Sequence, residues 1–510
     1  MRNRDQKIAT LNNEFDVVIV GGGINGAVSA AALSAHGVKV ALLEANDFAS
    51  MTSQESSNMV WGGIKYLQDF EFKLVWSLCK SRNQLLSKYP NRIKEIPFFA
   101  VVGETSPFSR NLGLLGSAAY WFFGRFKTQM PKIFSNDKIQ SINSLVNVKS
   151  AKGAVQYNDA ILLDNDSRFV YDFIKTAERF DSTALNYFEV TDAVKTDSGW
   201  EISAKDKITG QMHFLKSKVL INAAGPYTKI FNDQFAIPTA NEIVISKGVH
   251  LIVPHIETNG KVLTFFDDSG RLFYVLPMHD RTVIGTTDTF AFDAKEGVTD
   301  SDREFLLAQA NRCLNLPKPL TKDDIIAERC GVRPLVVKDA ASLDNVDWIS
   351  LSRKHVVELH KDLNAISIYG GKLTDCINVG LEVVALTKKL GIQTNSAQSW
   401  IGEAEPAIPA GLFQKVSEFH GEAGPQIARE LWRRHGRIAL EIVDGWEEDS
   451  SAARVVFKGL GFTYGELEYI AKHENVYFAD DLLRRRTPIA LLRSREEIAA
   501  AGLDGLKVRN

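Results

Sequence analysis

Hydrophobic and polar positions along this chain fall into patterns that predict a parallel sheet near its start. Residues 16–20, DVVIV, are an apolar, β-branched run that ends in glycines, which is typical of a buried parallel strand. An alanine-rich segment at 27–35 predicts a helix, and the apolar run at 38–43 predicts a second strand. A strand, a helix and a strand in this order indicate a βαβ unit.

Three glycines lie where the first strand turns into the helix. Gly21, Gly23 and Gly26 have G-x-G-x-x-G spacing, and Glu44 follows the second strand. Glycines in such a turn let the backbone approach a pyrophosphate closely, and the helix N-terminus favours its negative charge. The Glu44 carboxylate suits the ribose hydroxyls of a dinucleotide, so NAD or FAD is favoured over NADP.

The order of strand, glycine and helix recurs further along the chain. Residues 218–222 form an apolar strand that runs into Gly225, where small residues let the backbone approach the cofactor again. Residues 365–369 form another strand that enters Gly371, and a helix is predicted from Leu373. The N-terminus of that helix would face the part of a flavin that gains negative charge on reduction.

The remaining segments complete a prediction of an α+β fold. Residues 242–350 alternate between apolar and polar positions, which indicates an antiparallel substrate-covering sheet with strands such as His250 to Val253, Leu272 to Leu276 and Thr282 to Gly285. We expect helices and loops at 66–150, a helix at 168–180, strands near 185–215, and helices at 411–421, 424–444 and 464–475. The predicted domains are a discontinuous cofactor domain (1–75, 151–240 and 351–392), a substrate-binding and membrane-facing domain (76–150 and 241–350) and a helical C-terminal domain (395–510).

Composition narrows the functional classes. A chain of 510 residues is long enough for two or three domains, and its formal charge of −2 gives no electrostatic support for binding nucleic acid. The four cysteines are scattered, which argues against a disulfide framework or a metal site and indicates a reducing compartment. The first fourteen residues lack the apolar core of a secretory signal, so we expect a cytoplasmic protein.

One apolar segment suggests contact with a membrane surface. Residues 111–124, NLGLLGSAAYWFFG, are apolar and aromatic, and Arg110, Arg125 and Lys127 flank them. The segment is too short to span a bilayer, but it could lie in the interface with its basic flanks on lipid phosphates. A buried core helix would have the same pattern, so both interpretations stay open.

A hydroxyl-rich loop follows Glu44 and leads into a pair of glycines. Thr52, Ser53 and Ser57 could donate hydrogen bonds to pyrophosphate or ribityl oxygens, and Gly62 and Gly63 would let the backbone lie against a flat ring. A solvated loop would have the same composition, because serine and threonine are ordinary turn residues.

These stretches together resemble the FAD-dependent glycerol-3-phosphate dehydrogenases of the aerobic, membrane-associated type. The resemblance covers nearly the whole chain and rests on DVVIVGGGINGA, TSxxSS, GGIKYL, LINAAGPY (220–227), SKGVHLIVP (246–254), IGTTDT (284–289), GVRPL (331–335), YGGKLTD (369–375) and HENVYFADDLLRRRT (473–487). It implies a Rossmann-like FAD domain of the glutathione-reductase type. It also implies oxidation of sn-glycerol 3-phosphate to dihydroxyacetone phosphate, transfer of electrons to membrane quinone, peripheral attachment to the inner face of the plasma membrane, and a homodimer as one expectation.

The resemblance also assigns roles to individual residues. His250 is the expected base, Arg333 and Arg353 the expected holders of the substrate phosphate, and Lys372 a contact to substrate and flavin. Further substrate contacts are expected from Lys65, Tyr66 and Thr287, and further cofactor contacts from Gly225, Gly371, Lys372 and Leu373. Outside the resemblance, His250 could be structural, the arginines could form salt bridges, and the threonine could be a turn residue.

One stretch departs from the family. Where the family has Lys-Leu-Ile-His-Gly-Gly-Leu-Arg-Tyr, this chain has Asn58, Trp61 and Lys65 at the first, fourth and eighth positions. These changes leave the cofactor untouched but bear on the substrate. Three alternatives therefore stay open: an oxidase that uses oxygen, a flavin enzyme for another small hydroxy or amino compound, and a flavin-binding membrane-docked partner without turnover.

Overall fold

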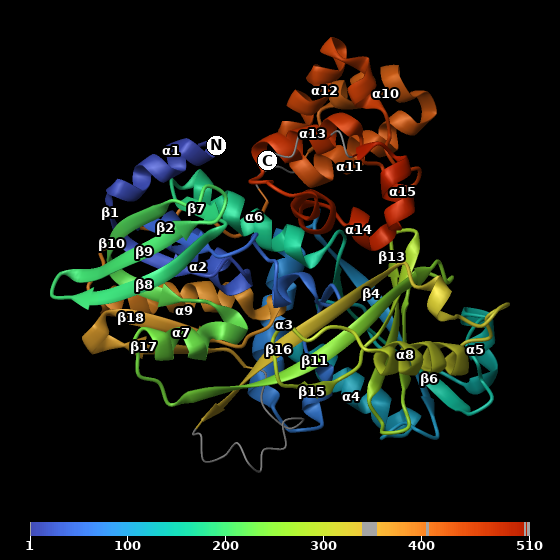
Figure 1. Ribbon diagram of the computed structural model, residues 1–510. Helices are drawn as coiled ribbons and strands as arrows, with labels where there is room; N and C mark the ends of the chain where they lie inside the picture. The colour runs from blue at the N-terminus through green and yellow to red at the C-terminus, as the bar shows by residue number, and fades with distance from the viewer. Residues whose placement is uncertain (1, 339–353, 404–406, 504–505, 507–510) are drawn as a thin grey trace.

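The computed structural model describes residues 2–338, 354–403, 407–503 and 506. Figure 1 shows two β-sheets side by side, with a bundle of helices from the C-terminal part of the chain above them. The first sheet carries the dinucleotide motif, and the second contains most of the middle of the chain. The predicted combination of a Rossmann-like sheet, an antiparallel sheet and a helical C-terminal region is confirmed.

The first sheet is built around the predicted βαβ unit. Strand β1 (Glu14–Val20) pairs in parallel with β2 (Val40–Glu44) and with β10 (Met212–Asn222), and α2 (Ile24–Ala35) connects β1 to β2. Strand β7 (Thr183–Asn186) continues the parallel sheet beyond β2, and β18 (Ala365–Tyr369) continues it beyond β10. The carboxyl ends of β1, β10 and β18 therefore lie at one edge, where a ligand of such a sheet binds.

Other elements extend and cover this sheet. The antiparallel pair β8 (Phe188–Thr196) and β9 (Gly199–Asp206) joins β10, and β17 (Val356–His360) pairs antiparallel with β18. Helix α2 packs against α6 (Asp166–Arg179) and α9 (Cys376–Lys389). The predicted helices at 168–180 and after Leu373 are thus confirmed, the latter beginning with the short turn η8 (Leu373–Asp375).

The second sheet has the order β15–β11–β14–β13–β12–β4–β6–β3, with β16 beside β11 and β5 beside β6. All its pairs are antiparallel except the parallel pair of β12 with β4. Its strands are β3 (Met59–Val60), β4 (Ile93–Gly103), β5 (Lys132–Phe134), β6 (Ala151–Leu162), β11 (Asn241–Pro254), β12 (Val262–Phe266), β13 (Leu272–Met278), β14 (Arg281–Gly285), β15 (Thr289–Ala291) and β16 (Ala327–Lys338). The predicted antiparallel strands after residue 242 are confirmed.

One sequence-based expectation about the second sheet is wrong. Residues 66–150 are not only helices and loops, because β4 and β5 lie within them. Pro97, which lacks an N–H, disguises β4 as a non-strand segment, yet it lies opposite Asn158 in the ladder. Residues 151–162 were expected in the cofactor domain, but as β6 they pair with β4 in the second sheet. The domain boundaries themselves stay a prediction.

The C-terminal region contains α10 (Ala410–His420), α11 (Gly424–His435), α12 (Ile438–Glu448) and α13 (Tyr464–His473). The single helix expected at 424–444 is therefore two helices, because the chain turns at Gly436 with a φ of 57°. A π-helical turn, η11 (Asp481–Arg486), and the short helices α14 (Ile489–Leu492) and α15 (Arg495–Ala500) follow. The remaining helices are α1 (Arg4–Ala9), α3 (Phe72–Lys88), α4 (Arg110–Phe123), α5 (Asn136–Ile142), α7 (Thr228–Gln234) and α8 (Asp300–Cys313).

Candidate active site

The glycine turn between β1 and α2 leaves open space at one position only. A Cβ on Gly21 would lie 2.4 Å from the Ala223 carbonyl oxygen, and one on Gly26 would lie 1.9 Å from the Gly21 carbonyl oxygen. Gly21 therefore lets the end of β1 lie close to the chain after β10, and Gly26 lets α2 pack closely against the turn after β1. A Cβ on Gly23 would meet only the Ser53 hydroxyl, at 3.2 Å. The space in front of the helix N-terminus thus fits a pyrophosphate.

Three more groups shape this cradle. The Ile24 N–H at the start of α2 donates to the Ser53 hydroxyl oxygen over 3.0 Å, so the loop contributes a polar atom where a phosphate would lie. Gly225 has a φ of 60° and nothing within 4 Å of an added Cβ. Glu44 accepts hydrogen bonds from the backbone of Gly22 (2.6 Å) and Asn46 (2.8 Å), while burial raises its carboxyl pKa. Its contact with ribose stays a prediction.

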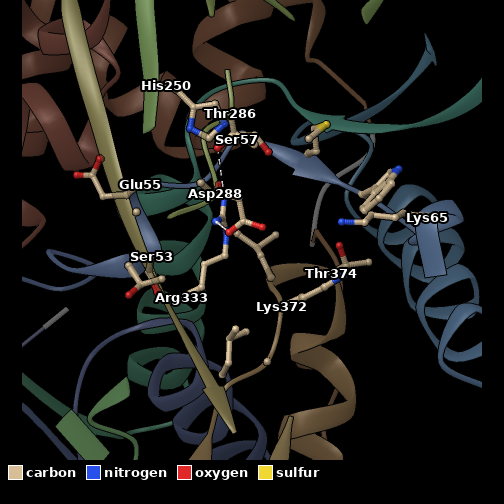
Figure 2. Close-up of a pocket in the computed structure, with 18 of the residues that line it drawn as sticks. Ser53, Glu55, Ser57, Lys65, His250, Thr286, Asp288, Arg333, Lys372 and Thr374 are labelled. Carbon is tan, nitrogen blue, oxygen red and sulfur yellow. Dashed lines mark hydrogen bonds and ion pairs between the residues drawn. The ribbon is translucent and has the colours of Figure 1, made fainter. Parts of the chain in front are cut away.

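A cavity of about 320 Å³ lies between the two sheets, next to this cradle. Figure 2 shows its labelled side chains converging from β11, β16, the loop after β2, the turn after β3, the segment after β14 and the turn after β18. The predicted residues that line it are Thr52, Ser53, Ser57, Lys65, Tyr66, His250, Arg333, Gly371, Lys372 and Leu373. The structure therefore brings together residues that lie more than 300 positions apart in the chain.

His250 occupies a row of four residues that crosses four strands. On β11 it lies opposite Arg329 of β16 and Gly285 of β14, and Gly285 in turn lies opposite Tyr274 of β13. A Cβ on Gly285 would lie 2.5 Å from the His250 ring, so this glycine makes room for the imidazole. Within the described residues, neither ring nitrogen of His250 has a hydrogen-bond partner.

The surroundings of His250 keep its imidazole neutral. Burial, and after it the guanidinium groups of Arg329 and Arg333, lower the pKa of His250 to about 3. A neutral imidazole with unpartnered nitrogens can accept a proton from a ligand in the cavity. The lowered pKa makes this group a weak base until an anion offsets the two guanidinium charges.

Arg333 reaches the cavity from β16 because β11 has a glycine beside it. Its guanidinium donates to the Asp288 carboxylate (3.1 Å) and to the Thr286 hydroxyl (3.3 Å). A Cβ on Gly248 would lie 2.1 Å from the Arg333 Nη2 atom, so the guanidinium passes directly over that glycine. Figure 2 shows Arg333 extending toward Asp288 and Thr286 below His250. The salt bridge expected as an alternative is present, and it leaves the guanidinium at the cavity wall.

Lys372 and two aromatic rings form the opposite wall. The Lys372 ammonium donates to the Tyr66 hydroxyl and lies 3.9 Å from the Tyr66 ring centroid and 5.5 Å from that of Trp61. Trp61 and Tyr66 are 6.0 Å apart between centroids. Trp61, one of the departures from the family, therefore packs against Lys372 and Tyr66, which are both predicted to contact the substrate.

Other predicted residues have packing roles that their motifs did not reveal. A Cβ on Gly62 would lie 2.2 Å from the Tyr120 hydroxyl, and Gly63, with a φ of 82°, lies against the Tyr66 ring. The Thr287 hydroxyl accepts a hydrogen bond from the Val249 N–H (2.9 Å), which fixes the strand before His250. None of the three lines the cavity in the described part of the chain, and their binding roles stay predictions. Arg353 lies outside the described residues.

Sequence reasoning did not select several residues of this site. Glu55, Arg271, Asp288 and Lys354 line the cavity, and Arg329 lies behind His250. Asp288 lies in the motif IGTTDT, and Arg329 follows Glu328 in β16. Neither position indicates by itself that the side chain lies at the cavity or beside His250. Among the described residues, no group of three or more His, Cys, Asp or Glu side chains could hold a metal ion.

The fold and this cradle define a dinucleotide-binding oxidoreductase, and comparisons with known proteins identify its class. The sequence pattern of the FAD dependent oxidoreductases matches residues 16–357. The glycerol-3-phosphate dehydrogenase of Bacillus halodurans, solved with FAD, superposes with a TM-score of 0.75 at 23% identity, covering 99% of this chain and 92% of that one. The L-alpha-glycerophosphate oxidase of Mycoplasma pneumoniae, with FAD bound, has a TM-score of 0.60 at 18% identity, covering 78% of this chain and 100% of that one.

Relatives in sequence narrow the class to one family. The aerobic glycerol-3-phosphate dehydrogenase of Staphylococcus haemolyticus is 31% identical over 74% of this chain and 68% of its own length. The Escherichia coli protein of the same name is 28% identical over 92% of this chain and 93% of its own. The chain belongs to the FAD-dependent glycerol-3-phosphate dehydrogenases.

Proposed function

We propose that this protein oxidises sn-glycerol 3-phosphate to dihydroxyacetone phosphate with FAD and passes the electrons to membrane quinone. Bound FAD supplies the acceptor for the hydride that leaves carbon 2 of the substrate. The observation that carries the proposal is the convergence of the neutral His250 imidazole and the Arg333 guanidinium on a cavity beside the dinucleotide cradle. Gly21, Gly23, Glu44, Ser53 and Gly225 would hold the cofactor.

His250 takes the proton of the carbon 2 hydroxyl in this proposal. Its imidazole is neutral in the free protein because burial, and after it the charges of Arg329 and Arg333, oppose its protonation. A substrate phosphate near Arg333 offsets part of this positive charge and so raises the affinity of the imidazole for a proton. Substrate binding thus makes His250 a better base at the moment when a base is needed.

Cations around the cavity, among them Arg271 and Lys354, favour a substrate that carries a phosphate. Arg333 is held by Asp288 with its guanidinium already at the wall, so little conformational freedom is lost on binding. Lys65 and Lys372 supply further charges, and Arg353 another by resemblance to the family. Lys65 replaces a family arginine, so it offers a point charge without the planar fork that pairs with two phosphate oxygens.

Anaerobic flavin bleaching tests the proposal. We expect glycerol 3-phosphate to bleach the flavin absorbance of the purified protein within seconds, while glycerol and small amines do not. If only an uncharged polyol or an amine bleaches the flavin, the enzyme has another substrate. The changes at Asn58, Trp61 and Lys65 make a different substrate the main alternative to this proposal. If the reduced flavin is reoxidised rapidly by air but not by a quinone analogue, the protein is an oxidase.

Peripheral attachment to a membrane is supported by the surface around α4. The α4 patch consists of exposed apolar side chains on α4 and on the segments next to it: Phe70, Phe72, Trp76, Leu112, Leu115, Phe122 and Phe126. Only Ser117 and Tyr120 of the helix are buried, which argues against the core-helix alternative. Helix α4 lies at the lower edge of the second sheet in Figure 1. No helix in the described ranges has the length and apolar character needed to cross a bilayer.

The patch has the composition of an interfacial surface. Leu115 is 66% exposed and Phe122 is 58% exposed, and the basic residues Arg110, Arg125 and Lys127 flank them. Apolar side chains with basic neighbours bind anionic lipid surfaces. The inner face of the plasma membrane, where quinone is available, fits this chemistry. A homodimer stays a separate prediction, which sedimentation velocity would test.

A further inference from the structure

The loop that follows β2 is fixed from the C-terminal region by three consecutive arginines. We call residues 45–57 the cofactor loop, because they contain Thr52, Ser53 and Ser57 at the cavity. Arg484, Arg485 and Arg486 belong to η11, more than 400 residues away in the chain. Each of them donates at least one hydrogen bond to the cofactor loop.

Asp47 is the centre of this contact. Its side chain is fully buried, and both carboxylate oxygens accept two hydrogen bonds each. Arg485 donates over 2.6 Å, Arg486 donates two bonds over 2.8 Å, and Asn186 donates over 2.7 Å. Burial alone would raise the pKa of Asp47, but the adjacent charge of Arg486, followed by that of Arg485, holds it below its ordinary value.

The contact continues from Asp47 to the dinucleotide cradle within two residues. The Phe48 side chain is buried against the glycine turn, where a Cβ on Gly22 would lie 2.6 Å from its ring. The Ala49 N–H donates to the Gly22 carbonyl oxygen over 3.0 Å. Further along the loop, Arg484 donates to the Gln54 carbonyl oxygen and to Glu55. The arginines therefore hold the loop on both sides of Ser53.

The same turn is fastened to the C-terminal helices and to the first sheet. Arg486 also donates to the carbonyl oxygens of Glu474 and Asn475, which follow α13. The Glu474 carboxylate in turn accepts hydrogen bonds from Arg168 on α6, at the edge of the first sheet. A displacement of η11 would therefore displace the cofactor loop. A displacement of the loop would in turn displace η11 and the residues that follow α13.

We propose that Arg484, Arg485 and Arg486 are positioning residues for FAD, and that through them residues 474–487 and the cofactor stabilise each other. This inference rests on the proposed function only in assigning residues 45–57 to the cofactor. Coupling of two sites is reciprocal: if an intact η11 strengthens FAD binding, bound FAD must equally stabilise η11. A structural element without influence on the cofactor would lack both effects.

Release of FAD from the full-length holoenzyme tests the first half. Asp47→Asn removes the charge that pairs with Arg485 and Arg486 and keeps the shape of the side chain. Glu466→Gln is a matched control, because Glu466 is also fully buried and accepts from Arg434 (2.5 and 2.7 Å) within the C-terminal helices, away from the loop. We expect Asp47→Asn to release FAD about tenfold faster than the wild type, with the control unchanged.

Hydrogen exchange on the wild type tests the second half without any substitution. We expect the amides of residues 474–487 to exchange more slowly in the holoenzyme than after FAD is removed, while those of 424–435 exchange equally. This measurement decides the proposal if Asp47→Asn does not fold. Equal exchange at 474–487 in both states, or equal FAD release from Asp47→Asn and Glu466→Gln, would overturn it.

A third variant tests separately whether residues 45–57 bind the cofactor, which the proposed function assumes. Ser53→Ala removes the loop hydroxyl that faces the cradle and leaves Asp47 untouched. If Ser53→Ala releases FAD faster and Asp47→Asn releases it at the normal rate, residues 45–57 do bind the cofactor but the coupling through the arginines is refuted. Normal release from both variants would refute the loop assignment and the coupling together.

Discussion

Replacing Arg329 should change the pH dependence of catalysis without removing a group that touches the substrate. Arg329 is fully buried, lies directly opposite His250 and donates to the Ser56 carbonyl oxygen and the Asn58 side chain. Its Nε and Nη2 atoms have no partner among the described residues. Glu55, Asp166 and Arg484 are the other charges that act on it, and Arg333 is the second cation that acts on His250.

The size of the effect follows from the strand geometry. Residues directly opposite in an antiparallel pair have Cβ atoms about 5 Å apart, which places the two charged head groups roughly 7 Å apart. At an effective dielectric constant of about 20, two unit charges at that distance interact by about 2.4 kcal/mol. Arg329→Gln should therefore raise the pKa of His250 from about 3 toward 5, by less than two pH units, because burial, the largest cause of the low pKa, remains.

The assay is kcat/KM for glycerol 3-phosphate as a function of pH, which reports ionisations of the free enzyme. His250 must be neutral to act, so activity is lost as the pH falls through its pKa. We expect kcat/KM of Arg329→Gln to fall below about pH 5, whereas that of the wild type and of Arg329→Lys does not. The ionisation of the substrate phosphate affects all three proteins equally. Arg329→Gln combined with Asn58→Lys should return the profile toward the wild type. Superimposable profiles for Arg329→Gln and the wild type, with FAD fully bound, would refute this account of His250.

Further predictions concern the cofactor, the phosphate, the fold and the membrane. Gly23→Val should abolish FAD retention, measured as flavin absorbance per protein, because its side chain would fill the open space of the cradle. Arg333→Ala should lower kcat/KM by about 150-fold, on the order of 3 kcal/mol, because the substrate charge loses its paired donor, whereas Lys65→Arg should lower KM. Gly26→Ala should destabilise the protein by about 1–3 kcal/mol or more in urea unfolding, because its Cβ would overlap the Gly21 carbonyl. Leu115→Glu with Phe122→Glu should stop sedimentation with anionic liposomes, whereas Trp121→Glu is a poor test because the Trp121 indole N–H donates to the Thr128 carbonyl oxygen within the fold.

The cofactor side of the site could be predicted because its signals are local. The glycine spacing, the strand before it and Glu44 all lie within thirty residues, and the backbone contact that requires Gly26 arises inside the same βαβ unit. The contact that requires Gly21 comes from Ala223, after the distant strand β10. The β6 strand could not be assigned to its sheet in this way. Its partners β3 and β4 lie far apart in the chain, and nothing in residues 151–162 indicates which strand they join.

The substrate side shows the same limit at the level of single residues. Gly248 lies within SKGVHLIVP, yet its need for glycine comes from the Arg333 guanidinium on the neighbouring strand. Gly62 and Gly63 suggested contact with a flat ring, which stays a prediction, and nothing in their motif indicated that Tyr120 and Tyr66 pack against them. A motif shows that a small residue is required at a position, but only the packing shows which neighbour requires it.

The departure at Asn58 lies next to a buried cation from another strand. Asn58 stands where the family pattern described above has a lysine, and its side-chain oxygen accepts a hydrogen bond from Arg329, 3.1 Å away. A buried cation therefore still lies at this place, but it comes from β16 and stands behind His250. Because Arg329 has no freedom to leave its buried position, its charge acts on the imidazole whether or not substrate is present. Trp61 then occupies the wall beside Lys372 as an uncharged aromatic surface, so the positive charge on that side of the cavity comes from Lys65 and Lys372.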